Sequence, residues 1–174
     1  MIKPFLPVLS AFTMGRELSK KSGETRMHRL TNNNGINLIK IFEGFRAEAY
    51  VCAGGYLTIG YGHKLLPSDP YKVVTEEKAE QILHNDLRKV ERAVLKYINV
   101  EINDDQFAAL VSFTFNVGAA ALQRSTLRQK INYGYYDEAR KEFLKWTYAD
   151  GRKVMGLVRR RKLESQLFGS FLNN

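Results

Sequence analysis

The sequence predicts an α+β protein with a small β-hairpin lobe and a larger helical lobe, joined by a long helix. Changes in hydrophobic periodicity lead to this prediction. Apolar residues recur at helical spacing over residues 35–44, alternate as in β-strands over residues 50–59, and return to helical spacing after residue 75. At 174 residues the chain suits one domain, or two lobes that share a helix, with a buried core.

The first helix is predicted over residues 35–44 and carries Glu43 at its end. Glu43 follows Ile36 by seven residues and Ile39 by four, so its carboxyl lies on the apolar face of the helix. Burial disfavours the ionised form of a carboxyl, and the negative end of the helix dipole acts in the same direction. We therefore interpret Glu43 as a group that keeps a proton near neutral pH, which a general acid requires.

A β-hairpin is predicted next, because Gly54 and Gly55 separate two short apolar runs. A three-residue loop at 54–56 would place Cys52 and Thr58 directly opposite each other, on one face of the ribbon. We prefer this register to a two-residue loop at the glycines, which would turn the two side chains to opposite faces. The glycines that follow Thr58 would let a long ligand approach the backbone closely, and the absence of a Walker lysine pattern argues against a nucleotide.

The remaining elements are helices. A loop at residues 67–70 precedes a long helix that Thr75 caps and that continues to Tyr97, and this helix joins the two lobes. The segment 107–117 is apolar nearly all round, which predicts the buried central helix of the helical lobe. Further helices are predicted over residues 125–134, 136–146 and 156–168, with a turn at 149–151 before the last one.

Three consecutive arginines, residues 159–161, lie in the last helix. We expect them to form a partly solvated face, with Arg160 paired to Glu164 one turn later. One of the three is expected to turn inward.

Residues 1–31 do not fit this plan, and we expect a disordered extension ahead of a single domain at residues 32–174. The apolar run at residues 5–12 resembles an export signal only weakly, because it is short, contains Pro7 and precedes a basic polar stretch. The run is also too short to cross a bilayer. A weak export signal and a true start at Met27 remain alternatives.

The net charge of +9 predicts a polyanionic partner. No recognised nucleic-acid-binding motif is present in the sequence. The carboxylates and anionic polymers of a bacterial cell wall would attract this positive charge equally well. Cys52 is the single cysteine, which excludes an intramolecular disulfide and is simply explained by synthesis in a reducing cytoplasm. Metal-ligand spacings such as H-E-x-x-H or paired C-x-x-C are absent from the sequence, so we expect no metal and no other cofactor.

Three ordered motifs carry a family resemblance. They are the spacing of Glu43, Cys52 and Thr58 with the Thr-Ile-Gly-Tyr-Gly-His segment that follows, the apolar segment 105–118, and the closing segment 156–168. Together they resemble the phage-type lysozymes, or endolysins, of glycoside hydrolase family 24, over about residues 34–171. The resemblance implies a lysozyme-like fold and an enzyme that hydrolyses the β-1,4 bond between N-acetylmuramic acid and N-acetylglucosamine in bacterial peptidoglycan.

The resemblance also implies catalytic roles. Glu43 matches the proton donor, Thr58 matches a threonine near the attacking water, and Cys52 stands where most members have aspartate. A thiol with an ordinary pKa is only slightly ionised at neutral pH, so Cys52 either positions the water or acts as a weak base. We predict an inverting mechanism in which Glu43 and Cys52 are separated by roughly 6.5–9.5 Å.

Five further residues are predicted to bind the substrate: Tyr61, His63, Phe115, Asn116 and Arg160. The resemblance places Arg160 close to Glu43, where its charge would oppose the effect of burial, and the sequence does not decide which effect is larger. His63 is also explained by a structural salt bridge, and Asn116 by an ordinary polar position near a helix end.

We expect a monomer that is made in the cytoplasm of a bacterial host and acts on the periplasmic cell wall. Its predicted partners are peptidoglycan and a holin-like permeabilising protein on which its action depends, with no nucleic acid and no stable insertion into a membrane. Two alternatives remain open. A lytic transglycosylase also uses one essential glutamate and leaves anhydro-muramyl ends, and a non-catalytic basic module would only bind the wall.

Overall fold

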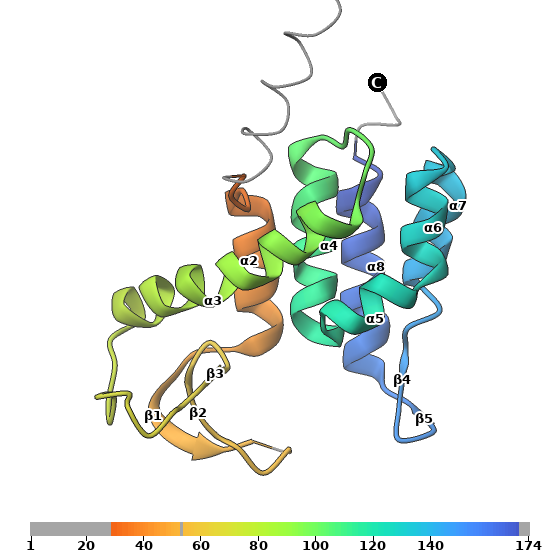
Figure 1. Ribbon diagram of the computed structural model, residues 1–174. Helices are drawn as coiled ribbons and strands as arrows, with labels where there is room; N and C mark the ends of the chain where they lie inside the picture. The colour runs from red at the N-terminus through yellow and green to blue at the C-terminus, as the bar shows by residue number, and fades with distance from the viewer. Residues whose placement is uncertain (1–28, 53, 171–174) are drawn as a thin grey trace, which may run out of the picture.

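The computed structural model describes residues 29–52 and 54–170, which form two lobes. One lobe is a small antiparallel sheet and the other is a bundle of helices, and the long helix α3 (Glu76–Tyr97) runs between them (Figure 1). The predicted α+β class, with a hairpin lobe and a helical lobe joined by a long helix, is confirmed.

Helix α2 (Asn33–Glu43) leads into the sheet lobe. Its first turn is capped by Asn32, whose side chain accepts a hydrogen bond from the amide of Gly35. The helix ends at Gly44, which has a positive φ of 70° and turns the chain into the first strand. The predicted position of Glu43, at the end of this helix, is therefore confirmed.

The sheet contains β1 (Arg46–Val51), β2 (Leu57–Gly60) and β3 (His63–Lys64) in that order. In the β1–β2 pair, Thr58 lies opposite Tyr50, while the amide of Cys52 donates to the carbonyl oxygen of Tyr56 at 2.9 Å. The predicted direct opposition of Cys52 and Thr58 is thus wrong by two residues. The physical reason lies in the turn, because a three-residue hairpin loop ends on a left-handed residue and Gly55 (φ 78°) takes that conformation readily.

A register shift of two residues keeps every side chain on the same face of a strand. Cys52 and Thr58 therefore still share one face of the ribbon, as diagonal rather than direct neighbours.

Helix α3 begins as predicted, because the side chain of Thr75 accepts a hydrogen bond from the amide of Lys78. The helix contacts β2 and β3 in one lobe and α4 (Asp104–Val117) and α5 (Ala119–Arg124) in the other. The prediction that it joins the lobes is confirmed. No helix in the described ranges is long and apolar enough to span a membrane.

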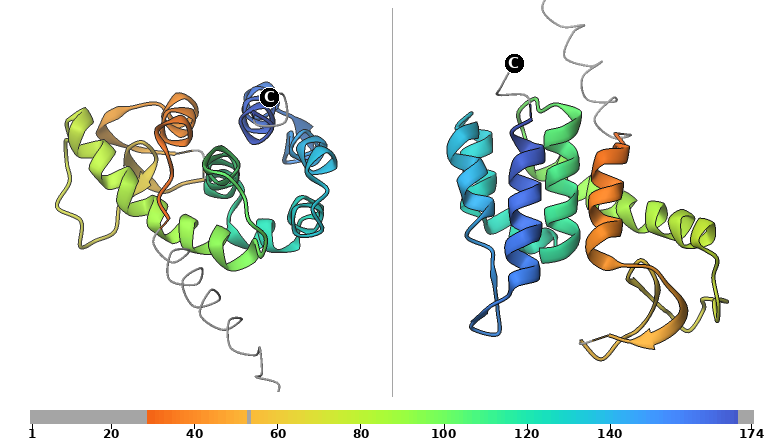
Figure 2. Two further views of the ribbon diagram at one scale, coloured as in Figure 1. Left: turned by 90° about the horizontal axis from the view of Figure 1, so that it is seen from above. Right: turned by 180° about the vertical axis from the view of Figure 1, so that it is seen from behind.

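Helix α4 is the centre of the helical lobe, and every residue from Gln106 to Thr114 is buried. A capping box at Asn103 and Gln106 fixes its start. The views in Figure 2 show α4 enclosed by its neighbours, and α2, α3, α5 and α8 (Met155–Phe168) all contact it. The prediction of a buried central helix is confirmed.

The last part of the chain differs from the prediction in three places. Helix α5 was not anticipated, and after α6 (Thr126–Asn132) the helix α7 (Tyr136–Phe143) ends before the predicted boundary at 146. The predicted turn at 149–151 is the tip of a hairpin between β4 (Tyr148–Ala149) and β5 (Arg152–Lys153). Asp150 (φ 49°) and Gly151 (φ 73°) are both left-handed, as in the two-residue turns that suit the twist of a hairpin.

The described structure begins at Arg29, so the predicted extension at 1–31 lies mostly outside the described residues. Arg29 donates to the carbonyl oxygen of Ile102 at 2.8 Å and pairs with Asp104 at 2.6 Å. The amide and the hydroxyl of Thr31 both donate to Glu91 Oε1 at 2.8 Å. The contacts of the fold thus begin a few residues before the predicted boundary.

Candidate active site

Glu43 lies at the junction of the two lobes, where α2 ends against the sheet. Its side chain is 23% exposed, which is partly buried but still open to a ligand. The turn between β2 and β3 lies against its carboxyl group, because a Cβ atom added at Gly62 would be 3.4 Å from Glu43 Oε2. Gly62 also has a positive φ of 84°, so this position favours glycine for two independent reasons.

The importance of Gly62 was only partly visible in the sequence. The Gly-x-Gly spacing indicated a close approach to the backbone, but the approaching group that the structure shows is the carboxyl of Glu43. No sequence pattern links these two positions, because the turn and the helix end meet only in the folded protein.

Arg160 holds the other oxygen of Glu43. The distance from Arg160 Nη1 to Glu43 Oε1 is 2.6 Å, which is the proximity that the family resemblance implied. Arg160 is only 3% exposed and also donates to Glu164 Oε1 at 3.1 Å and to the carbonyl oxygen of Ser112 at 3.1 Å. All three nitrogens of the guanidinium group are therefore engaged, and Arg160 is fixed by α8 and α4 before any ligand binds.

Glu164 and Arg161 extend this contact into the interior. Glu164 is fully buried and accepts a hydrogen bond from Ser112 Oγ at 2.7 Å, and Arg161 Nη1 lies 2.8 Å from its Oε2. Burial lowers the pKa of Arg161 to about 10, which leaves its guanidinium charged at neutral pH. The charges of Glu43, Arg160, Glu164 and Arg161 thus alternate in sign along one network, which runs from the partly exposed Glu43 into the interior.

The sequence prediction for the arginine run is partly wrong. One of the three was expected to turn inward, but Arg160 and Arg161 are both buried while Arg159 is exposed. The predicted pair between Arg160 and Glu164 is present, although inside the protein rather than on a solvated face. Two adjacent helical positions are both buried here because α8 is covered by α4 and α7 and also contacts α2.

Cys52 and Thr58 form the polar pair on the hairpin. Thr58 is 3% exposed, and its Oγ1 donates to the carbonyl oxygen of Tyr56 at 2.9 Å. A hydrogen bond with the side chain of Thr58 lowers the pKa of the Cys52 thiol, with smaller contributions from backbone hydrogen bonds and from the charge of Lys64. The assumption of an ordinary thiol pKa, made from the sequence, is therefore corrected. The separation of Glu43 and Cys52 stays a prediction.

The hydroxyl of Thr58 has a single proton, so its partners depend on the state of the thiol. While Thr58 donates to Tyr56, it can only accept from the S–H group of Cys52 or from a water. A Cys52 thiolate would instead attract the Thr58 proton, which is the hydrogen bond that favours the thiolate.

The predicted substrate-binding residues are not all placed together. Tyr61 is 4% exposed in the core, and its hydroxyl donates to Glu76 Oε1 at 2.5 Å, so the structure argues against a substrate contact for Tyr61. The Gly-x-Gly segment turns sharply at this point, and the turn directs the tyrosine ring into the protein.

His63 has the structural role that was its alternative interpretation. Its Nδ1 lies 2.8 Å from Asp86 Oδ2, and its Nε2 lies 3.4 Å from Asp69 Oδ2. These contacts tie β3 to α3 and to the loop after β3. His63 nevertheless also lines a pocket.

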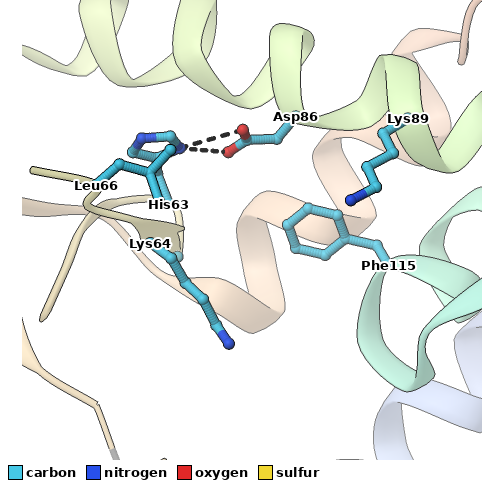
Figure 3. A pocket seen from close by; sticks show the side chains of 7 residues that line it. His63, Lys64, Leu66, Asp86, Lys89 and Phe115 are labelled. Carbon is cyan, nitrogen blue, oxygen red and sulfur yellow. Dashed lines mark hydrogen bonds and ion pairs between the residues drawn. The ribbon is translucent and has the colours of Figure 1, made fainter. Parts of the chain in front are cut away.

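This pocket, of about 320 Å³, lies between β3, the middle of α3 and the end of α4 (Figure 3). It is lined by Gly62, His63, Lys64, Leu66, Asp86, Lys89 and Phe115, and we call it the β3–α3 pocket. It adjoins the carboxyl of Glu43 because Gly62 contributes to both. Phe115 is thus placed where a ligand near Glu43 could contact it.

Asn116 is exposed at the end of α4, next to Phe115. Its Oδ1 accepts a hydrogen bond from Arg161, which connects it to the buried charge network. The amide nitrogen remains as a donor for a ligand. Within residues 29–52 and 54–170, no group of three or more His, Cys, Asp or Glu side chains is arranged to hold a metal ion.

Comparisons with known proteins show the family to which the chain belongs. Residues 40–164 match the model of a family described as phage lysozyme. The endolysin of Bacillus phage B103 is 48% identical over 136 residues, which cover 77% of this chain and 52% of that protein. The endolysin of Acyrthosiphon pisum secondary endosymbiont phage 1 is 39% identical over 145 residues, which cover 80% of this chain and 97% of that protein.

The chain therefore spans about half the length of the first curated relatives that it matches. It spans nearly the whole length of the endolysin of the Acyrthosiphon pisum secondary endosymbiont phage. Among solved structures, the endolysin from Escherichia coli O157:H7 phage FAHEc1 is similar with a TM-score of 0.74 and 36% identity. The aligned part covers 81% of this chain and 94% of that chain.

Proposed function

Because the chain belongs to the phage lysozyme family, we propose that it is an endolysin muramidase. Its reaction is the hydrolysis of the β-1,4 bond between N-acetylmuramic acid and N-acetylglucosamine in bacterial peptidoglycan. The observation that carries the proposal is the partly buried carboxyl of Glu43, held by Arg160 on one side and bounded by Gly62 on the other, at the edge of a pocket between the lobes.

Glu43 is the general acid of the proposed reaction. In the free protein, the guanidinium of Arg160 attracts the ionised carboxylate across 2.6 Å. When a glycan covers the site, water is excluded and the partly exposed carboxyl loses solvation, so the protonated form becomes more favourable. Glu43 then gives its proton to the leaving glycosidic oxygen. Arg160 is a positioning residue, because its other two nitrogens fix it to α4 and α8.

Cys52 and Thr58 hold the attacking water on the opposite face of the sugar ring. The water oxygen attacks the anomeric carbon while a proton passes to the Cys52 thiolate, and the bond to the leaving oxygen breaks as that oxygen takes the proton of Glu43. The product has inverted configuration, because no covalent sugar intermediate forms. Thr58 supports the thiolate, since its hydrogen bond is the largest influence that lowers the pKa of Cys52.

The proposed partner is peptidoglycan, and the charge of +9 favours approach to an anionic wall. The protein acts as a monomer on the periplasmic wall of the host in which it is made. A holin-like permeabilising protein gives it access to that wall. Asn116 supplies a hydrogen-bond donor and Phe115 an apolar surface for the sugar.

Turbidity loss of permeabilised bacteria tests the activity. Glu43→Gln should abolish it, while Glu48→Gln, the same change at an exposed glutamate of β1, should not affect it. Product mass spectrometry then identifies the reaction. Reducing N-acetylmuramic acid ends are expected, and anhydro ends lighter by one water would show a lytic transglycosylase instead. Full activity of Glu43→Gln would refute the general-acid assignment.

A further inference from the structure

The β3–α3 pocket carries positive charge on two opposite walls. Lys64 extends from β3 and Lys89 from α3, and the ring of Phe115, from α4, lies on the Lys89 side in this view (Figure 3). Neither lysine takes part in an ion pair with any residue in the described ranges. The ammonium group of Lys64 lies 3.6 Å from the centroid of the Tyr56 ring, a contact that leaves its charge available.

The acidic side chain that lines the same pocket, Asp86, is already paired with a histidine. Asp86 binds Nδ1 of His63 at 2.8 Å, and the nearby Asp69 lies 3.4 Å from the other ring nitrogen. Burial raises the pKa of Asp86 against the opposing hydrogen bond from His63. The positive charges of Lys64 and Lys89 are therefore the ones presented to a ligand.

The position of the pocket limits what this ligand can be. Gly62 lines the pocket and also lies against Glu43, which places the pocket beside the group that protonates the glycosidic oxygen in the proposed reaction. In peptidoglycan, the acidic peptide stem is attached to the N-acetylmuramic acid itself.

We propose that the β3–α3 pocket binds a carboxylate of the peptide stem through Lys64 and Lys89, with Phe115 and Leu66 as its apolar surface. This inference rests on the proposed function and adds a substrate preference to it. The enzyme then favours glycan strands that carry free stem carboxylates over strands in which these groups are neutral.

The test compares Lys64→Gln, Lys89→Gln and the double variant on three substrates. These are intact peptidoglycan, the same material with its stem carboxylates amidated, and intact material freed of wall phosphate polymers. The double variant Lys96→Gln with Lys141→Gln is the matched control. Both lysines are exposed and lie outside the pocket, and their replacement removes the same amount of positive charge. Release of reducing ends gives kcat and KM for each combination of variant and substrate.

For the double variant we expect KM on intact peptidoglycan to rise about three- to ten-fold, as the loss of two exposed ion pairs predicts. The rise should be much smaller on amidated material and unchanged by removal of phosphate polymers. Lys89→Gln alone should give part of the rise, which matters because Lys64 also influences the Cys52 thiol. The control should show a smaller rise that is equal on intact and amidated material.

An equal defect on amidated material, or in the control, would overturn the inference. A defect that disappears only after removal of phosphate polymers would identify phosphate as the ligand and would also overturn it. Co-sedimentation of the Glu43→Gln protein with intact and amidated peptidoglycan measures the same preference without catalysis. If the unmodified protein releases no product but this binding preference is present, the proposed function fails and the pocket assignment stands.

Discussion

Replacing Glu164 with glutamine should strongly destabilise the protein, because Glu164 carries the charge that lies between two buried guanidinium groups. Glu164 is fully buried, lies 3.1 Å from Arg160 Nε and 2.8 Å from Arg161 Nη1, and also accepts from Ser112 at 2.7 Å. The amide oxygen of glutamine can still accept from Ser112, so the change removes mainly the charge. Loss of one partner from a buried ion pair costs about 3–5 kcal/mol.

This loss corresponds to a fall in Tm of about 6–20 °C, at roughly 2–4 °C per kcal/mol for a protein of this size. Scanning calorimetry and urea unfolding measure it. Glu101→Gln is the control, because Glu101 is exposed in a loop, and its change should stay within about 0.5 kcal/mol. A loss below about 1 kcal/mol for Glu164→Gln would refute the reasoning, because the network would then not depend on alternating charge.

Two further predictions concern the hairpin and its turn. Cys52→Ser should lower kcat more than Cys52→Asp, because only aspartate supplies an anionic acceptor, and the reverse order would remove Cys52 as a base. Activity that needs the thiolate should be gained as pH rises through a pKa below that of an ordinary thiol, and the pH dependence of Cys52 alkylation should report the same lowered pKa. Gly62→Ala should cost about 1–2 kcal/mol through its φ of 84° and should also lower kcat, because the methyl group would lie 3.4 Å from Glu43 Oε2. Gly134→Ala, where φ is 79° and nothing lies within 4 Å of the added atom, should show the stability loss alone, and an equal loss of kcat would contradict the assigned contact.

The parts of the fold that the sequence predicted well depend on neighbouring residues. The cap at Thr75 and the end of α2 at Gly44 are set by hydrogen bonds and φ angles within one turn of chain. The buried helix α4 was also predicted correctly, because its apolar composition is a property of one continuous segment. The predicted hairpin register was wrong by two residues, because the residues that form the three-residue loop are selected by the geometry of the turn and not by the glycine pair alone.

The chemistry of the candidate site divides in the same way. The sequence by itself determined that Glu43 ends a helix beside a hairpin with Cys52 and Thr58 on one face, because strand alternation and helix periodicity are local properties. Only the tertiary structure decided that Arg160 and Arg161 are buried together, that Tyr61 belongs to the core, and that Gly62 meets the Glu43 carboxyl. These outcomes depend on contacts between elements far apart in the chain, and neither residue spacing nor composition specifies which side chains meet there.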